Sequence, residues 1–391
     1  MKIINFETYL VDAWCSNYLF LKIETDEGIY GIGECTLEYC EHTVIAALEH
    51  MRAMLIGQNP LDIENIHHIL ERDTYWRYGP VLSSAISGVD IALWDLKGKY
   101  YKVPVYDLLG GKVRDRIPIY ANAWYIGSKT PEDFARHAEY TVSKGIKALK
   151  WDPFGDSYLD LKLPELRASM RCVEAVRKAV GPDIDLLIEA HGRFNRTGAL
   201  KIANALKDYD VFFLEEPLTP GNNECLRDVR EKSPVPIAAG ERVYSRFDFA
   251  DMIYTNCIDY VQPDVSHVGG LTELKKVAVL ADSKYLTCAP HNPMGPGTNA
   301  ATMHADATIV NFAYQETMFT DVPWRNDICK ESNVLIDGEM VLSNEPGLGI
   351  ELNFEAFKDH PERKGIHLHH YNGELTGIRP EGSGTWMDID K

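Results

Sequence analysis

The 391-residue chain has little positive charge and no long apolar run. Its 40 Lys and Arg residues are outnumbered by 58 Asp and Glu residues, which gives a formal net charge of −18. Such a chain is repelled by nucleic acid and by anionic membranes, so we expect neither as a partner. No apolar run approaches the ~18 residues of a membrane span. The first residues, MKIINFETYL, lack a basic region followed by an apolar block, so we expect no signal peptide and a cytoplasmic protein.

Several short motifs are also missing. The eight cysteines are scattered without a CxxC pair, which argues against a zinc or thioredoxin-like site and makes a reduced compartment sufficient. GIGEC contains Gly31 and Gly33 but lacks the third glycine of a dinucleotide fingerprint, and no phosphate-cradling GxxxxGK[ST] is present. We therefore do not expect a nucleotide enzyme. An anionic substrate would need a metal ion or local Arg and Lys residues to bind to so acidic a chain.

The first third of the chain reads as strands followed by helices. Composition is that of a globular protein, with 45% hydrophobic and 25% charged residues. IINFETYLV and YLFLKIET predict antiparallel strands within residues 1–35, and LSSAISGVDIALWDLKGKYY places apolar residues at helical spacing. This order predicts an α+β module. The Gly-rich stretch LLGGKVRDRIP, near 108–118, marks the expected domain boundary.

Beyond that boundary, strands and helices alternate. The expected strands lie at 119–124, 147–151, 185–189, 211–215, 236–241, 259–264, 285–291 and 311–316. Eight strands with helices between them predict a (β/α)8-type barrel, an α/β fold whose functional residues lie at the C-terminal ends of the strands.

Three of these strands end in glutamate. Glu189 follows LLI, Glu215 follows VFFL and Glu241 follows AAG, at equal intervals of 26 residues. The three carboxylates should therefore meet at one mouth of the barrel, where they cannot all stay ionised without a cation. Oxygen ligands favour a hard divalent ion, so we expect Mg²⁺. A single glutamate of this kind is usually solvated or salt-bridged, but three at equal spacing are harder to explain that way. Glu216 should point away and pair with a basic side chain.

The later strand ends carry acid–base groups. Asp264 and His291 are 27 residues apart, so the aspartate can hold the histidine as a base. His191 should face the same mouth, and the sequence offers it no such acid one strand further along. A lone histidine is more often a structural residue, but two beside a predicted metal site favour catalysis.

Further polar residues are candidates for substrate contacts. Glu316 ends the expected eighth strand, and Lys150 and Asp152 flank Trp151 so that both should point inward. Trp76 lies in Tyr-Trp-Arg-Tyr, which fits a substrate-facing loop and cap packing equally well.

The motifs IEAHGRF, LEEP, AAGERVYSRFDF, VQPDVSHVGG, APHNPMGP and PGLGIE together resemble the mandelate racemase subgroup of the enolase superfamily, and within it the galactonate dehydratase-like acid-sugar dehydratases. The resemblance covers about nine-tenths of the chain. It implies an N-terminal α+β capping domain (1–118), a modified (β/α)7β TIM-type barrel (119–350) and a C-terminal segment (351–391) that packs back on the cap. A homo-oligomer is also expected.

The resemblance also implies roles for the candidate residues. Glu189, Glu215 and Glu241 match the Mg²⁺ ligands, Asp264 and His291 match the family's dyad, and the remaining catalytic positions fall on His191 and Glu316. Cap segments near Trp14–Tyr18 and Leu37–Glu41 would close over the sugar. The first ligand is commonly Asp in galactonate dehydratases, and Lys150-Trp151-Asp152 replaces the Lys-x-Lys of the racemases.

The missing second-strand lysine favours dehydration over racemisation, and the resemblance implies dehydration of an aldonate, galactonate first, to a 2-keto-3-deoxy acid. His291 would take the α-proton and His191 would protonate the departing 3-hydroxyl. The alternatives are a racemase or epimerase on the same scaffold, which would not release water, and a non-catalytic sugar-acid-binding protein. A non-catalytic binding protein would not need a proton-transfer pair.

Overall fold

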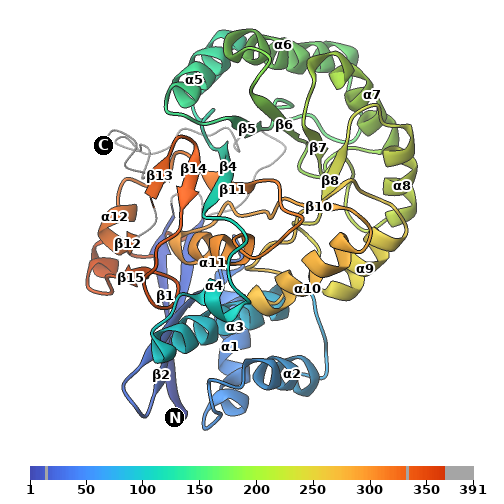
Figure 1. The fold of residues 1–391 in the computed structure, drawn as a ribbon. Coiled ribbons are helices and arrows are strands. Elements are labelled where there is room, and N and C mark those ends of the chain that lie inside the picture. Colours follow the sequence, from blue (N-terminus) through green and yellow to red (C-terminus); the bar gives the residue numbers. More distant parts are fainter. Residues whose placement is uncertain (14–15, 332–333, 366–391) are drawn as a thin grey trace.

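The computed structural model describes residues 1–365 except 14–15 and 332–333, so Trp14 and the end of the expected C-terminal segment, 366–391, lie outside the described residues. The N-terminal part is the expected α+β unit (Figure 1). Its strands form one antiparallel sheet with β2 in the centre. The elements of this unit are β1 (Ile3–Asp12), β2 (Asn17–Thr25), β3 (Tyr30–Glu34), α1 (Glu41–Leu55), α2 (Ile63–Asp73) and α3 (Pro80–Tyr101), followed by the short α4 (Val105–Leu108).

The two glycines of GIGEC have a packing role. A Cβ atom on Gly31 would lie 2.0 Å from the carbonyl oxygen of Ala92, and one on Gly33 would lie 2.1 Å from that of Gly88. Only glycine lets the backbone of β3 lie this close to α3. The partial resemblance to a dinucleotide fingerprint therefore comes from strand–helix packing.

The second part is a barrel in which strands and helices alternate (Figure 1). Its strands are β4 (Arg116–Asn122), β5 (Ala148–Trp151), β6 (Asp185–Glu189), β7 (Phe213–Glu215), β8 (Ile237–Ala239), β9 (Tyr260–Val261), β10 (Thr287–Cys288) and β11 (Gln315–Met318). Its helices are α5 (Pro131–Ser143), α6 (Leu163–Val180), α7 (Arg196–Leu206) with the 3₁₀ turn η1 (Lys207–Tyr209), α8 (Asn223–Lys232), α9 (Arg246–Tyr254), α10 (Gly270–Asp282) and α11 (Pro296–Asp306).

The strands are parallel and follow the chain order from β4 to β10, and β11 returns to pair with β4. A bridge between Cys288 and Phe312 joins the segment before β11 to β10 and closes the ring. The predicted (β/α)7β barrel with a capping domain is therefore confirmed. The eighth strand runs from Gln315 to Met318, not over 311–316, so the expectation that Glu316 ends it is wrong. The register explains the shift, because Glu316 pairs with Tyr120 and the ladder continues to Asn122.

The run VFFLEEP is explained by the pleat of β7. Phe213 packs in the small apolar cluster of the barrel interior, whereas Leu214 belongs to the larger core between strands and helices. Both side chains are fully buried, and Glu215 follows as the last residue of the strand. Alternation then points Glu216 away from the interior, where Arg242 Nη2 lies 3.2 Å from its Oε2. The predicted pairing of Glu216 with a basic residue is confirmed.

Several helices of the barrel begin at a side-chain cap. Thr130, Asn195, Asn222 and Ser245 each accept a hydrogen bond from a backbone N–H group in the first turn of α5, α7, α8 and α9, respectively. These caps end the loops that leave the C-terminal side of the strands. They therefore fix the segments that carry the candidate functional residues.

After the barrel, the chain returns to the capping unit. The segment contains α12 (Arg325–Ile328), β12 (Cys329–Glu331), β15 (Ile350–Leu352) and η2 (Ala356–Asp359). Between β12 and β15, β13 (Val334–Ile336) and β14 (Glu339–Val341) form a hairpin that extends the barrel sheet, because β14 pairs antiparallel with β4. The ring of Phe357 stacks on Phe20 of β2 at a centroid distance of 5.4 Å, and Pro361 forms a bridge with Val11 of β1. The expected domain limits stay a prediction. Within the described residues, no helix combines the length and the hydropathy needed to cross a bilayer.

Candidate metal centre and active site

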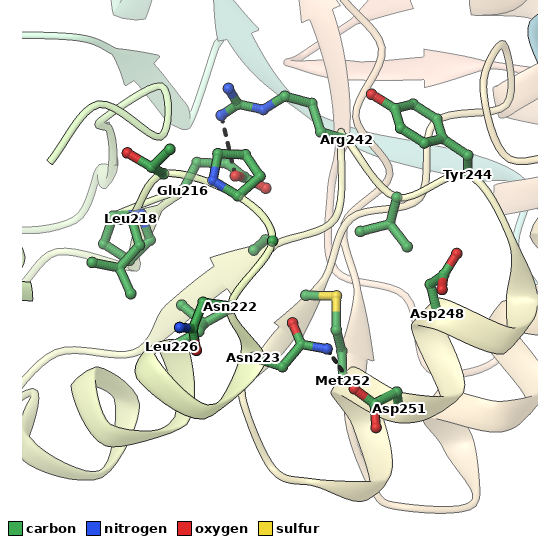
Figure 2. Close-up of a pocket in the computed structure, with 16 residues that line it drawn as sticks. Glu216, Leu218, Asn222, Asn223, Leu226, Arg242, Tyr244, Asp248, Asp251 and Met252 are labelled. Atoms are coloured by element: carbon green, nitrogen blue, oxygen red, sulfur yellow. Dashed lines mark hydrogen bonds and ion pairs between the residues drawn. The ribbon is translucent and has the colours of Figure 1, made fainter. Parts of the chain in front are cut away.

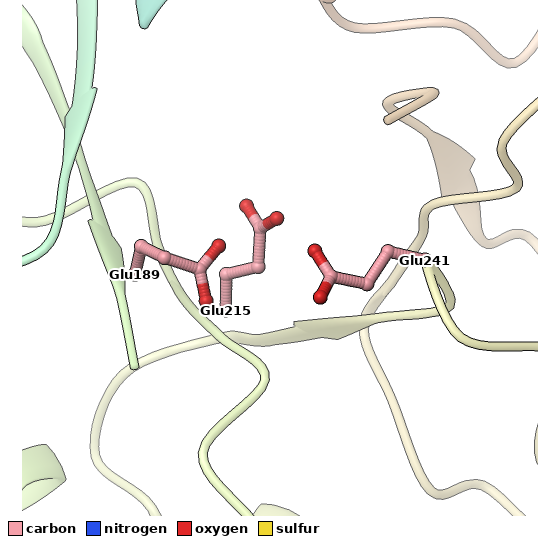
Figure 3. Close-up of side chains that lie close together, drawn as sticks. All are labelled: Glu189, Glu215 and Glu241. Carbon is pink, nitrogen blue, oxygen red and sulfur yellow. The ribbon is translucent and has the colours of Figure 1, made fainter. Parts of the chain in front are cut away.

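Three glutamates meet at the C-terminal mouth of the barrel (Figure 3). Glu189 and Glu215 end the neighbouring strands β6 and β7 and are paired in register, and Glu241 follows β8 by two residues. One carboxylate oxygen from each lies within 4.8 Å of the other two. Each 26-residue interval spans one helix and one strand, so the three side chains occupy equivalent positions on successive strands and their carboxylates lie together.

The donor atoms of this cluster suit a divalent cation. Glu189 Oε2 and Glu215 Oε2 are buried and have no hydrogen-bond partner among the described residues. Burial, together with the nearby charge of Glu241, raises the pKa of Glu189 to about 7, and burial beside Glu189 raises the pKa of Glu215 well above its ordinary value. Carboxylates that repel one another in a buried site, with oxygens free to accept a ligand, fit a hard oxygen-preferring ion.

Lys150 lies at the base of the cluster. Its Nζ is 2.8 Å from Glu215 Oε1, 2.8 Å from Glu316 Oε1 and 3.6 Å from Glu189 Oε2, and its side chain is only 2% exposed. Burial alone would lower the pKa of Lys150, but the charges of Glu215 and Glu316 raise it well above the ordinary value. Lys150 is therefore a resident positive charge among the acids. Its expected contact with substrate stays a prediction.

The expected pair of Asp264 and His291 forms on one side of the cluster. His291 Nδ1 lies 2.7 Å from Asp264 Oδ2, and His291 Nε2 lies 3.1 Å from Glu241 Oε2. Burial would lower the pKa of His291, but Glu241, Glu316 and Asp264 outweigh it and raise the pKa to about 10. The N–H group of Ser266 also donates to Asp264 Oδ1 at 2.6 Å. Asp264 is thus held rigidly while it orients the ring.

His191 also has an acidic partner, which lies on the strand before it and not on the strand after it, where the sequence offers none. His191 Nδ1 lies 2.6 Å from Asp152 Oδ2, and Arg193 Nη2 lies 2.5 Å from the same oxygen. The acid comes from the end of β5, the strand before β6, and not from the strand after it. The turn that carries His191 is left-handed, with φ of +48° at His191 and +60° at Gly192.

The two histidines lie on opposite sides of the mouth. His191 follows β6 and His291 follows β10, and β7, β8 and β9 lie between these strands in the sheet. In an eight-stranded ring this is half a turn. A substrate held at the glutamate cluster would therefore have one histidine on each side.

Two family models match this chain. The model described as "Mandelate racemase / muconate lactonizing enzyme, N-terminal domain" matches residues 13–110, and the model "Enolase C-terminal domain-like" matches residues 133–356. The chain belongs to the mandelate racemase subgroup of the enolase superfamily. Members of this superfamily bind a divalent metal, and the buried glutamate cluster fits one.

Relatives and solved structures agree with this assignment. The chain is 36% identical to a D-galactonate dehydratase of Pectobacterium atrosepticum, with 91% of this chain and 93% of the relative covered. It is 34% identical to a D-gluconate dehydratase of Thermoproteus tenax, with 90% and 71% covered. A member of the enolase superfamily from Salmonella Typhimurium superposes with a TM-score of 0.88 at 32% identity, covering 92% of this chain and 98% of that one. A mandelate racemase/muconate lactonizing enzyme from Sulfitobacter sp. superposes with a TM-score of 0.89 at 30% identity, covering 94% and 98%.

Two predicted substrate-binding residues of this enolase-superfamily protein lie in different settings. Asp152 is 4% exposed, and besides His191 and Arg193 its carboxylate accepts a hydrogen bond from the N–H group of Phe154 at 2.8 Å. Trp76 lies on the loop between α2 and α3 with 76% of its surface exposed. A direct contact of either residue with substrate stays a prediction.

The sequence analysis missed two residues close to the dyad. His267 is buried, with Nε2 4.0 Å from Asp264 Oδ2 and Nδ1 2.9 Å from the hydroxyl of Ser84 on α3. Glu38 lies on the cap segment after β3, where burial raises its pKa and the charges of His267 and His291 oppose that rise. Leu37–Glu41 had been expected to lie over the site only as a segment, and no pattern within it distinguished Glu38. Likewise, a single buried histidine carries no signal in the sequence.

A cavity of about 440 Å³ lies beside the segments that follow β7 and β8 (Figure 2). Its lining includes Glu216 and Arg242, the chain neighbours of Glu215 and Glu241, and Tyr244 from the loop before α9. Asn222 and Asn223 at the start of α8 and Asp248 and Asp251 of α9 also line it, and Asn223 Nδ2 donates to Asp251 Oδ2 at 2.5 Å (Figure 2). The cavity is thus lined by both helices, which this hydrogen bond joins beside it.

Proposed function

We propose that the protein is an Mg²⁺-dependent dehydratase of acid sugars, which converts an aldonate to a 2-keto-3-deoxy acid. One observation carries the proposal: two histidines, each hydrogen-bonded to an aspartate, lie on opposite sides of a buried three-glutamate cluster. The D-galactonate and D-gluconate dehydratases among the relatives support this reaction and this class of substrate. Galactonate is the first substrate to test.

The glutamate cluster would hold the metal and, with it, the substrate carboxylate. Glu189, Glu215 and Glu241 are the proposed ligands. When bound, Mg²⁺ supplies the positive charge that lets an acidic site accept a carboxylate and stabilises the negative charge that develops on it. Glu316, held by Lys150 and by the side chain of Asn122, would donate a hydrogen bond from its protonated carboxyl group to the substrate carboxylate as negative charge builds up there.

His291 would remove the α-proton. Asp264 accepts the hydrogen at Nδ1, so Nε2, which faces the cluster, is the nitrogen that would take the proton once a bound cation offsets the charges of Glu241 and Glu316 that raise its pKa. The electron pair of the broken C2–H bond is first delocalised into the carboxylate group and then becomes part of a C2–C3 double bond when the C3–O bond breaks. The ring of His191, held by Asp152, would give its proton to the departing hydroxyl, which leaves as water. The resulting enol would then tautomerise to the 2-keto product.

The second candidate is a racemase or epimerase, and the Asp152–His191 pair favours it more than the sequence did. A two-base reaction needs a proton acceptor and a proton donor on opposite faces, and both histidines now have an acid partner. Against this candidate, Asp152 replaces the second lysine of the Lys-x-Lys pattern that resemblance to racemases would require. A non-catalytic sugar-acid-binding protein would need neither pair. A cytoplasmic location and a homo-oligomeric state complete the proposal.

Incubation with a library of C5 and C6 acid sugars and Mg²⁺ in deuterium oxide would separate these candidates. A dehydratase yields a 2-keto-3-deoxy acid, detected by NMR together with loss of the C2 proton. Deuterium at C2 with inverted configuration and no loss of water would establish the epimerase instead. Binding without exchange or turnover by any substrate would support the non-catalytic alternative. His291→Asn, which lacks the base, is the matched control for every substrate that reacts.

A further inference from the structure

A carboxylate of the capping unit reaches the loop that carries His291. Glu34, the last residue of β3, lies fully buried at the start of α11. Its Oε1 accepts a hydrogen bond from the N–H group of Gly295 at 2.9 Å. Its Oε2 accepts from the N–H groups of Gly297 at 2.9 Å and Thr298 at 3.2 Å. One cap side chain thus satisfies three backbone donors of a barrel segment more than 250 residues away.

The loop is shaped around this carboxylate. A Cβ atom on Gly295 would lie 2.7 Å and 2.8 Å from the two oxygens of Glu34, and one on Gly297 would lie 2.9 Å from Glu34 Cβ. Within the cap, the hydroxyl of Thr36 donates to Glu34 Oε1 at 2.9 Å and accepts from the N–H group of Leu19 at 3.0 Å. Burial raises the pKa of Glu34 to about 7, against the lowering effect of the donors. The contact is therefore closely fitted on both sides.

The other end of the same loop is held by the barrel. The N–H group of Asn292, next to His291, donates to Glu316 Oε2 at 3.0 Å, and its side chain donates to Asn299 Oδ1 of α11 at 3.1 Å. Residues 291–298 therefore lie between two fixed points. Glu316 holds the beginning and Glu34 holds the end. If the second point is released, α11 and the loop can move as one piece, and the ring of His291 moves with them.

We propose that Glu34 is a positioning residue for His291, through which the capping unit holds the base at its place beside the metal cluster. The inference rests on the proposed function, in which His291 is the base. It differs from a role in folding alone because it requires a change in Glu34 to reach Asn292 and His291, beyond the amides that Glu34 contacts directly.

The test compares Glu34→Gln with Asp95→Asn in the full-length protein. In Glu34→Gln, an NH₂ group replaces one acceptor, so at least one of the three N–H groups loses its partner whichever way the amide turns. Asp95 is a matched control, because it is a fully buried cap carboxylate that accepts from the backbone of Ile32 and of Leu348, beside a glycine. Glu34→Asp, which keeps the charge on a shorter chain, is the conservative variant.

The first measurement is amide hydrogen exchange at residue level, which needs no activity. The amide of Asn292 is decisive, since its acceptor, Glu316, is unchanged by the substitution. We expect it to exchange at least about 10-fold faster in Glu34→Gln, with wild-type exchange in Asp95→Asn. Faster exchange confined to Gly295, Gly297 and Thr298 would overturn the proposal, because the effect would then end at the contact.

The second measurement is turnover. Displacement of the base should lower kcat and C2–H exchange by the same factor, about 10- to 100-fold, with KM and metal affinity changed little. Glu34→Asp should recover part of the loss. A wild-type kcat in Glu34→Gln would also overturn the proposal. If the wild-type protein acts on no acid sugar, the proposed function fails, and the exchange rate of Asn292 still decides whether Glu34 positions the loop.

Discussion

Replacement of Asp152 by asparagine should separate loss of water from removal of the α-proton. Asp152 Oδ2 is the acceptor for His191 Nδ1 at 2.6 Å, and it also neutralises Arg193. Removal of a charge-assisted hydrogen bond costs about 1.5–3 kcal/mol, which is about 10- to 150-fold in the step that depends on it. We expect Asp152→Asn to slow the loss of water by that factor. Exchange at C2 should continue, because His291 and Asp264 are untouched.

The assay is NMR of substrate in deuterium oxide, with exchange at C2 and product formation followed together. His191→Asn should behave like Asp152→Asn, whereas His291→Asn should abolish both signals. Arg193→Gln is the matched control, since it removes the guanidinium and keeps the bond between Asp152 and His191. Equal loss of exchange and of water in Asp152→Asn would refute the assignment of acid and base. So would an unchanged rate of dehydration.

The remaining predictions concern the metal cluster. Chelation should abolish activity and Mg²⁺ should restore it; full turnover by the metal-free protein would contradict the requirement for metal. Glu215→Gln should lose metal binding in calorimetric titration while keeping its circular dichroism spectrum. Lys150→Met should destabilise the metal-free protein by about 3–5 kcal/mol, because the buried glutamates lose their counter-charge. Mg²⁺ should recover part of that loss in thermal melts. An unchanged melting temperature would argue against a stabilising role of Lys150. The pKa of His291 is raised to about 10, so its protonated ring stabilises the metal-free fold. This contribution is complete below pH ~6.5 and is lost as the pH rises through about 10. The difference in Tm between wild type and His291→Asn should therefore shrink across that window, and a constant difference would show that the pKa is not raised.

The strand ends were predictable from the sequence because their signal is periodic. Each interval between Glu189, Glu215 and Glu241 covers one helix and one strand, so equal spacing implies equal places in a barrel. The same regularity identified Asp264 and His291. Most of the observed strands are shorter than expected. β5, β6 and β7 end at the expected residue, whereas β8, β9 and β10 end two or three residues earlier.

Contacts between segments that are distant in the sequence left no periodic pattern from which they could be predicted. The pairing of Asp152 with His191 depends on side-chain direction in a left-handed turn, which sequence spacing does not encode. His267 and Glu38 reach the site only because α3 and the segment after β3 are folded against the barrel. Glu34 is separated from Gly295 by most of the chain, and its role depends on where the two domains meet. These residues were missed because domain packing brings them to the site.

The return of the chain to the capping unit has a consequence for synthesis on the ribosome. Phe20 in β2 stacks on Phe357, and Val11 in β1 is bridged by Pro361, so the first sheet to be made has neighbours that are among the last described residues. Chains are made from the N-terminus, and domains generally fold as units in that order. Here the cap must wait, with part of its apolar face uncovered, until the whole barrel has emerged. The nascent protein is thus expected to need protection from aggregation during translation, and the cap reaches its final packing only after the barrel has been made.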